Sequence, residues 1–214
     1  MNRITFSQSR GQTLIKWVLD RLMSAIALLI LSPLMLIVTL AIYTCMGRPI
    51  LFKQPRAGKN NRIFTCYKFR TMTNACDFEG NSLPDQQRLT KMGQFLRRTK
   101  LDELPQLWNV LIGDMSFVGP RPTLPEQVQD YDDFQKRRLL VCPGITGWAQ
   151  VNGNIQLNWP ERIFLDIWYI DHWSLWLDIV ILIKTIAVVI WGEHPAKKVL
   201  EEAQIYANCS YRSC

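Results

Sequence analysis

The run LMSAIALLILSPLMLIVTLAIYTCM, residues 22–46, contains 25 residues without one charged side chain. About 20 apolar residues in a helix are enough to cross the hydrocarbon core of a bilayer, which is about 30 Å thick. A cleaved secretory signal is disfavoured, because its apolar part is only about 7–15 residues long and no small-x-small cleavage site follows Met46. The run predicts a membrane segment that stays in the mature protein.

Ser32 and Pro33 lie near the middle of this run. Proline removes a backbone hydrogen bond and clashes with the preceding turn, so a kink or a break is expected there. Cytoplasmic segments normally carry the basic residues beside a membrane helix, but here both flanks carry them. They are Lys16, Arg21, Arg48, Lys53, Arg56 and Lys59. Two topologies stay open: a re-entrant helix hairpin, with Arg3 and Arg56 both facing the cytoplasm, and a tilted, kinked helix that spans the membrane.

The whole chain has 214 residues and a formal net charge of +7, which suits an anionic partner. Because basic residues gather beside the apolar run, anionic lipid is favoured over nucleic acid as that partner. The six cysteines show no C-x-x-C pair and no histidine at metal-ligand spacing, so they are expected to be reduced thiols. We expect a membrane segment with basic flanks (residues 1–48), a compact domain (49–195) and a C-terminal tail (196–214).

Outside the apolar run the pattern predicts a mostly α fold with a small β element. Residues 63–70 have the aromatic and β-branched content of a strand, and residues 58–61 before them suit a hairpin turn. Helices are expected at residues 86–98, 102–112, 125–140 and 158–168, the last one capped by Asn158.

A second apolar stretch, residues 173–191, contains Asp178 and Lys184. Each charge would cost about 2.5–3.5 kcal/mol at a bilayer centre, so the stretch is a poor spanning helix. It is expected to be an amphipathic helix that either lies at the membrane surface or packs on the domain.

Two adjacent carboxylates, Asp102 and Glu103, follow the basic residues Arg97, Arg98 and Lys100 at a predicted helix start. Cationic side chains and free backbone N–H groups together could hold a phosphate there. The alternative is structural: Asp102 caps the helix and Glu103 favours its dipole.

Arg121 stands between Pro120 and Pro122. The two prolines restrict the backbone, which lowers the entropy lost when the guanidinium is directed at a diphosphate. A buried salt bridge to Asp114 would explain the same residues.

A glycine-rich segment, residues 143–153, contains Gln150 and Trp148. It suits a loop whose backbone approaches a ligand closely. A turn–strand–turn with Trp148 in the core is the alternative.

Taken together, five ordered blocks resemble the monotopic phosphoglycosyl transferase family, also called bacterial sugar transferases, from Lys16 to Lys184. The blocks are Ser32-Pro33 and residues 67–72, 101–107, 113–122 and 143–153. There is one departure: members of the small subgroup often have Arg where Cys142 and Asn154 stand here, which puts phosphate contacts from those positions in doubt.

The resemblance implies a cytoplasmic domain at the bacterial inner membrane, on a re-entrant helix broken at Ser32-Pro33. It also implies a Mg²⁺ requirement, transfer of a sugar phosphate from a UDP-sugar to undecaprenyl phosphate with release of UMP, and a covalent phosphosugar intermediate on Asp102, which would also be a metal ligand. Glu103 would assist proton movement or bind the metal. The substrate-binding residues it implies are Lys68, Arg70, Arg97, Pro120, Arg121, Pro122 and Gln150.

Two rival classes remain at this stage. One is a membrane glycosyltransferase that passes only the sugar and releases UDP, and the other is a non-enzymatic basic membrane adaptor. The sequence identifies neither the sugar nor the glycan pathway. The sugar that we favour is an N-acetylated hexosamine. A homo-oligomer and contacts with other glycosyltransferases of the pathway are further expectations for partners.

Overall fold

Helix α1 (Arg10–Met46) is the longest element of the computed structural model, which describes residues 10–81 and 83–211. It contains the whole apolar run, and among the described residues it is the one helix long and apolar enough to cross a membrane. The expected position of Arg3 lies outside these residues.

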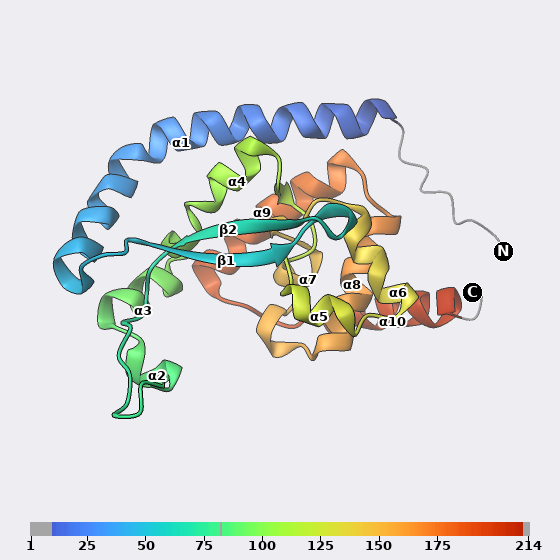
Figure 1. The fold of residues 1–214 in the computed structure, drawn as a ribbon. Coiled ribbons are helices and arrows are strands. Elements are labelled where there is room, and N and C mark those ends of the chain that lie inside the picture. The colour runs from blue at the N-terminus through green and yellow to red at the C-terminus, as the bar shows by residue number, and fades with distance from the viewer. Residues whose placement is uncertain (1–9, 82, 212–214) are drawn as a thin grey trace.

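The helix is continuous through Pro33 and bends in its C-terminal half, so the expected break is a bend and not an interruption (Figure 1). The Ser32 hydroxyl donates to the Leu29 carbonyl at 2.8 Å. A residue other than proline at position 33 would have bonded that carbonyl with its backbone N–H, so the serine replaces the bond that Pro33 cannot make.

Two strands, β1 (Leu51–Ala57) and β2 (Ile63–Phe69), form the antiparallel hairpin that the sequence predicts. The 3-10 turn η1 (Lys59–Asn61) joins them, and Leu51 pairs with Phe69 at the open end of the hairpin. A second, parallel pair consists of β3 (Ser116–Val118) and β4 (Gly144–Thr146). These short pairs are the small β element of a mostly helical fold.

The predicted helices between the strands are shorter than expected. Residues 86–98 divide into α2 (Asp85–Arg88) and α3 (Lys91–Arg98), because the Thr90 side chain accepts from Gly93 N and starts a new helix. Residues 102–112 divide into η2 (Leu101–Glu103) and α4 (Gln106–Ile112). Residues 125–140 form α5 (Pro125–Gln129), α6 (Asp133–Lys136) and η3 (Arg137–Leu140).

The C-terminal third of the chain contains the main core. It comprises α7 (Trp148–Val151), η4 (Asn154–Gln156), α8 (Trp159–Asp171), α9 (Leu175–Trp191) and α10 (Lys197–Tyr211). Helix α8 begins at the predicted Asn158 cap, and its Ile163, Leu165 and Ile167 are almost fully buried. Residues 197–211 are not a detached tail, because Ala203 and Ala207 of α10 are buried in this same core.

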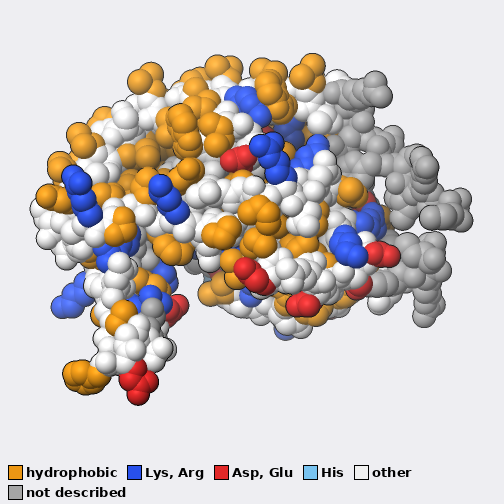
Figure 2. Space-filling view, viewed as in Figure 1, with side chains coloured by type: hydrophobic (Ala, Val, Ile, Leu, Met, Phe, Trp, Pro, Cys, Tyr) orange, Lys and Arg blue, Asp and Glu red, His pale blue; other side chains and the backbone are white. Residues whose placement is uncertain are grey.

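Helix α9 packs on the domain, which is one of the two interpretations of the second apolar stretch, and its contact with a membrane surface stays a prediction. Asp178 and Ile181 are buried on its inner face. Its outer face leaves large apolar side chains exposed, namely Trp176, Ile179, Ile183, Ile186, Ile190 and Trp191. Hydrophobic side chains also gather along α1 (Figure 2). Apolar surface of this extent on a folded domain marks a contact with lipid or with another protein.

Polar residues spaced four apart on one face of α1 bind the helix to the domain. Their shortest bonds to the domain are Lys16 Nζ to Asp178 (2.6 Å), Ser116 Oγ to Asp20 (2.7 Å) and Ser24 Oγ to the Leu107 carbonyl (2.5 Å). Asp178 also accepts from Tyr169 and Trp173, so the charge that would be costly in a bilayer is paired and hydrogen-bonded.

Within the described residues, Cys45, Cys66, Cys76 and Cys142 form no disulfide bond.

Candidate active site

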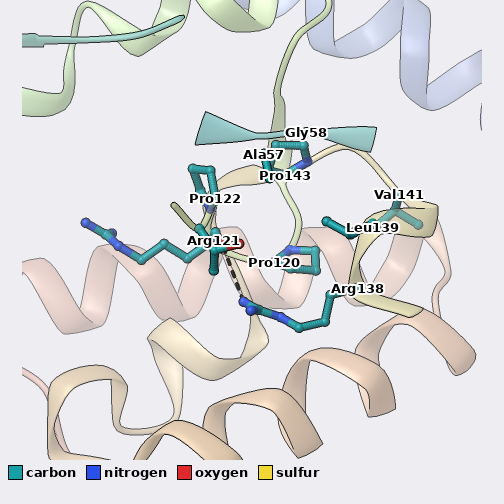
Figure 3. A pocket seen from close by; sticks show the side chains of 10 residues that line it. Ala57, Gly58, Pro120, Arg121, Pro122, Arg138, Leu139, Val141 and Pro143 are labelled. Atoms are coloured by element: carbon teal, nitrogen blue, oxygen red, sulfur yellow. Dashed lines mark hydrogen bonds between the residues drawn. The ribbon is translucent and has the colours of Figure 1, made fainter. Parts of the chain in front are cut away.

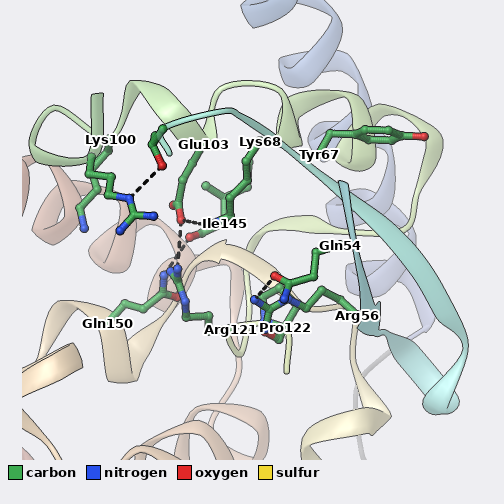
Figure 4. Close-up of polar contacts among 12 residues, drawn as sticks. Gln54, Arg56, Tyr67, Lys68, Lys100, Glu103, Arg121, Pro122, Ile145 and Gln150 are labelled. Carbon is green, nitrogen blue, oxygen red and sulfur yellow. Dashed lines mark hydrogen bonds and ion pairs between the residues drawn. The ribbon is translucent and has the colours of Figure 1, made fainter. Parts of the chain in front are cut away.

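Glu103 lies in η2 between two cations that reach it from distant parts of the chain (Figure 4). Lys68 Nζ of β2 lies 2.5 Å from Glu103 Oε1, and Arg121 Nη2 lies 3.0 Å from the same oxygen. Burial alone would raise the pKa of Glu103, but the Arg121 and Lys68 charges outweigh it and lower that pKa to about 2. Glu103 is therefore a fixed anion that positions the two cations.

Asp102 is buried, with 8% of its surface exposed, and has a different environment. No residue of the described chain donates a hydrogen bond to its carboxylate. Burial raises its pKa, and the neighbouring Glu103 charge raises it further against the attraction of Lys68 and Arg97. Two adjacent carboxylates whose environments move their pKa values apart are suited to different chemical roles.

The structural interpretation of Asp102 as a helix cap is wrong. The residue that precedes η2 is Lys100, in the left-handed region with a φ of 57°, and the residue that precedes α4 is Pro105. Neither helix start has a side-chain cap bond. The Asp102 carboxylate is thus available for other contacts.

Arg97 lies in the last turn of α3, and its charge is one of those that act on Asp102. Its Nε donates to Thr71 Oγ1 at 3.1 Å, which fixes the side chain. Thr71 lies two residues after the end of β2, and its contact with Arg97 was not predicted from the sequence. Arg97 is close enough for its charge to act on Asp102, and its role in substrate binding stays a prediction.

Arg121 does not pair with Asp114, so the salt-bridge alternative is wrong: its partner is Glu103, and its side chain is 44% exposed. Its backbone is fixed on both sides. Gly144 N donates to the Pro120 carbonyl at 2.9 Å, and Arg56 donates to the Pro122 carbonyl at 3.2 Å. Arg138 donates to the carbonyl of Arg121 itself, while the Arg121 side chain points away from this contact (Figure 3).

The glycines of residues 143–153 serve a close backbone contact within the protein. A Cβ at Gly144 would lie 2.1 Å from Gly119 N, and one at Gly147 would lie 2.2 Å from Gly119 O. Trp148 is buried, as the core alternative predicts, but it begins helix α7 and not a turn. Gln150 Nε2 donates to the Ile145 carbonyl at 2.9 Å and lies beside Arg121 (Figure 4).

A family model described as bacterial sugar transferase matches residues 11–192, which include every residue of this site named above. The chain belongs to the bacterial sugar transferase family. This confirms the resemblance seen in the sequence, and the chain is a transferase.

This chain is 48% identical over 173 residues to the uncharacterized sugar transferase EpsL of Bacillus subtilis. The alignment covers 80% of this chain and 86% of EpsL. It is 37% identical to an undecaprenyl-phosphate galactose phosphotransferase of Salmonella typhimurium, covering 85% of this chain and 41% of that protein. It is 42% identical to an undecaprenyl-phosphate glucose phosphotransferase of Komagataeibacter xylinus, covering 83% and 36%. The chain therefore spans less than half the length of these two relatives.

Two cavities of this chain share the lining residues Arg121, Gln150 and Asn154. The first, which we call the α9 cavity, has a volume of about 190 Å³ and is bounded by Glu103 and the C-terminal half of α9. The second, the arginine cavity, has a volume of about 180 Å³. Its further lining includes Arg56, Arg138, Arg162 and Trp159. Arg121 thus lines both a cavity in which two cations and two carboxylates balance and a cavity in which arginines predominate.

Arg70 is not brought to this site. Its buried guanidinium donates to the backbone carbonyls of Met46, Arg48 and Met72, which secures the end of α1 against the hairpin. Asn154 donates to Glu193, and burial raises the pKa of the Cys142 thiol, so neither position supplies a cation. Sequence reasoning did not find Glu193, which lies 90 residues from Glu103 and belongs to no motif.

Proposed function

We propose that this chain transfers a sugar phosphate from a UDP-sugar to undecaprenyl phosphate and releases UMP, as the first membrane step in the assembly of a bacterial glycan. The observation that carries the proposal is the unequal Asp102–Glu103 pair. One carboxylate is neutralised by Lys68 and Arg121, while the other is buried next to it and has no hydrogen-bond donor among the described residues. The names of the relatives, among them the galactose and glucose phosphotransferases, support the substrate class.

The reaction then proceeds in two displacements at one phosphorus atom. An Asp102 carboxylate oxygen attacks the phosphorus that bears the sugar, the bond from that phosphorus to the bridging oxygen breaks, and UMP leaves with this oxygen. A phosphate oxygen of undecaprenyl phosphate next attacks the same phosphorus. The bond to Asp102 breaks, which restores the carboxylate and gives a sugar linked to the lipid through a diphosphate.

The cations beside the pair stabilise the charge that develops on the transferred phosphate. Lys68 and Arg121 are held in place by Glu103, and Arg97 is held by Thr71, so none of the three must be reorganised during the reaction. Glu103, with a pKa of about 2, stays ionised at neutral pH and cannot deliver a proton. Its role in this mechanism is to position Lys68 and Arg121, and not to act as a general acid.

The residues present fit a Mg²⁺ ion. This ion prefers oxygen ligands, keeps several waters and is usually bound by one or two carboxylates together with substrate phosphates. Asp102 offers such a carboxylate, and the described part of the chain has no cluster of three or more acidic, His or Cys side chains that would form a complete site without substrate. When bound, Mg²⁺ would neutralise the donor diphosphate.

We also propose that α1 is re-entrant, with the domain on the cytoplasmic side of the inner membrane. Both halves of the helix contact the same domain: Ser24 bonds to α4, and Ile42 is buried with Phe69 and Leu96. If α1 were a straight helix that spans the membrane, the parts of the domain that contact Ser24 and Ile42 would lie on opposite sides of the bilayer. Single cysteines at Arg3 and Lys59, in an otherwise cysteine-free variant, should react with an impermeant thiol reagent only after the membrane is opened. Labelling of the Arg3 position in intact cells would contradict the topology.

The test of the function is the nucleotide released. Purified protein with undecaprenyl phosphate, Mg²⁺ and a panel of UDP-sugars should release UMP from at least one donor and form a lipid-linked sugar diphosphate. Release of UDP would indicate the glycosyltransferase that passes only the sugar. No turnover of any donor would favour the membrane adaptor.

A further inference from the structure

The α9 cavity is lined by both polar and apolar side chains. Next to Glu103 and Arg121 its lining is polar, with Lys100, Gln150 and Glu193. The wall formed by α9 and the start of α4 is apolar. Its volume of about 190 Å³ is enough for one small ring.

Two buried oxygen atoms of this lining lack a hydrogen-bond donor. They are Oε2 of Glu193 and Oε1 of Gln150, and no group in the described residues reaches either one. Leaving a buried acceptor unpaired costs about 1–3 kcal/mol, and more for a charged group. Native structures contain few such atoms, and each calls for an explanation such as a ligand.

Glu193 cannot simply turn away to solvent, because the chain around it is anchored. Its Oε1 accepts from Asn154 Nδ2 at 2.6 Å and lies 3.7 Å from Lys100 Nζ. Its own carbonyl accepts from Gln156 at 2.6 Å. These contacts hold Oε2 in a fixed position, in the way that a binding site is preorganised.

We propose that the α9 cavity binds the sugar ring of the nucleotide-sugar donor, and that Glu193 and Gln150 accept hydrogen bonds from its hydroxyl groups. A fixed carboxylate oxygen attracts a hydroxyl and repels a phosphate, so the cavity suits the sugar and not the phosphate of the lipid acceptor. A site that hydrogen-bonds a substrate hydroxyl discriminates strongly against substrates that lack it or direct it elsewhere. Glu193 therefore determines which sugar is preferred. The proposal rests on the function proposed above.

The test is the variant Glu193→Gln, which removes the charge and supplies an amide oxygen that can still accept from Asn154 Nδ2. The variant Glu202→Gln, on the exposed side of α10, is the matched control. The rate of the acceptor-free step, in which the protein takes the phosphosugar from the donor, is measured for the preferred UDP-sugar and for its epimers. Inhibition of that step by UMP, which has no sugar, is measured in parallel.

Glu193→Gln should change the ratio of kcat/KM between the preferred donor and its epimer by about tenfold or more, because it replaces a charged hydrogen bond. Inhibition by UMP should stay within about twofold of the wild type, since UMP makes none of these contacts. Gln150→Met, which removes the second unpaired oxygen at similar size, should change donor preference as well and carries the test if Glu193→Gln does not fold.

Unchanged donor ratios in both variants would overturn the sugar site. A raised KM for undecaprenyl phosphate with unchanged donor ratios would assign the cavity to the acceptor and overturn it equally. A failure of the proposed function would be seen differently, as the absence of UMP release from the wild type with every donor.

Discussion

Replacing Glu103 by Gln should destabilise the protein, because the negative charge of this residue holds Lys68 and Arg121 together. The Glu103 pKa is lowered from an ordinary 4.5 to about 2. At about 1.4 kcal/mol per pKa unit, the charged form contributes about 3 kcal/mol to the free energy of unfolding. For a chain of this length that corresponds to a decrease in Tm of roughly 6–12 °C.

The sign of the pH dependence follows from the lowered pKa. The stabilisation by Glu103 is fully present above its unfolded-state pKa of about 4.5 and is lost as the pH falls through about 2. The Tm difference between wild type and Glu103→Gln should thus be constant from about pH 8 to 5 and should narrow below that range. Thermal unfolding in detergent measures it, with Glu202→Gln as control. A Tm within about 2 °C of the wild type at pH 7 would refute the reasoning.

Three further outcomes are expected. Arg121→Lys keeps the charge but loses the planar fork, so donor turnover should fall about tenfold or more, whereas a purely structural role would lower Tm and leave turnover near normal. Because the Asp102 pKa is raised above its ordinary value of 3.8, kcat/KM in a pH–rate profile should fall toward acid as this carboxylate becomes protonated. Glu103→Gln removes one cause of the raised pKa, so the fall in kcat/KM should occur at lower pH in that variant. Lys16→Met leaves the Asp178 carboxylate without its cation and should lower the free energy of unfolding by about 3 kcal/mol. The double variant Lys16→Met/Asp178→Asn removes that uncompensated charge and keeps an oxygen that can accept from Tyr169, so much of the loss should be recovered in thermal unfolding; equal Tm values in the two variants would contradict the pairing.

The elements predicted well from the sequence are those decided by local signals. Helix α8 begins at its Asn158 cap with Pro160 in the first turn, and the hairpin turn lies at residues 59–61, next to the predicted strand. The divided helices show where local signals were missed. Thr90 and Asp132 each accept from the backbone N–H three residues later, and so start new helices inside stretches whose apolar pattern is continuous.

The sequence named several residues of the candidate site, but it wrongly included Arg70, missed Glu193 and did not give the arrangement. The motif residues Asp102, Glu103 and Arg121 were all identified from the sequence. The sequence did not predict that Lys68 and Arg121 pair with Glu103, because they lie 35 and 18 residues away from it and only packing brings the three together. Arg70 carries the same charge as Lys68 two residues earlier, yet its side chain is buried against the end of α1.

The central claim is that Asp102 carries the phosphosugar, and intact mass measurement tests it most directly. Wild-type protein is mixed with its UDP-sugar donor and Mg²⁺, without undecaprenyl phosphate. We expect the mass of one phosphosugar to be added, located at Asp102 by peptide mapping, and lost when undecaprenyl phosphate is supplied. Asp102→Asn should remain folded, because Asp102 caps no helix, and should show neither adduct nor turnover, since an amide is a poor nucleophile. Full activity in Asp102→Asn, or wild-type turnover without any adduct, would contradict the covalent mechanism.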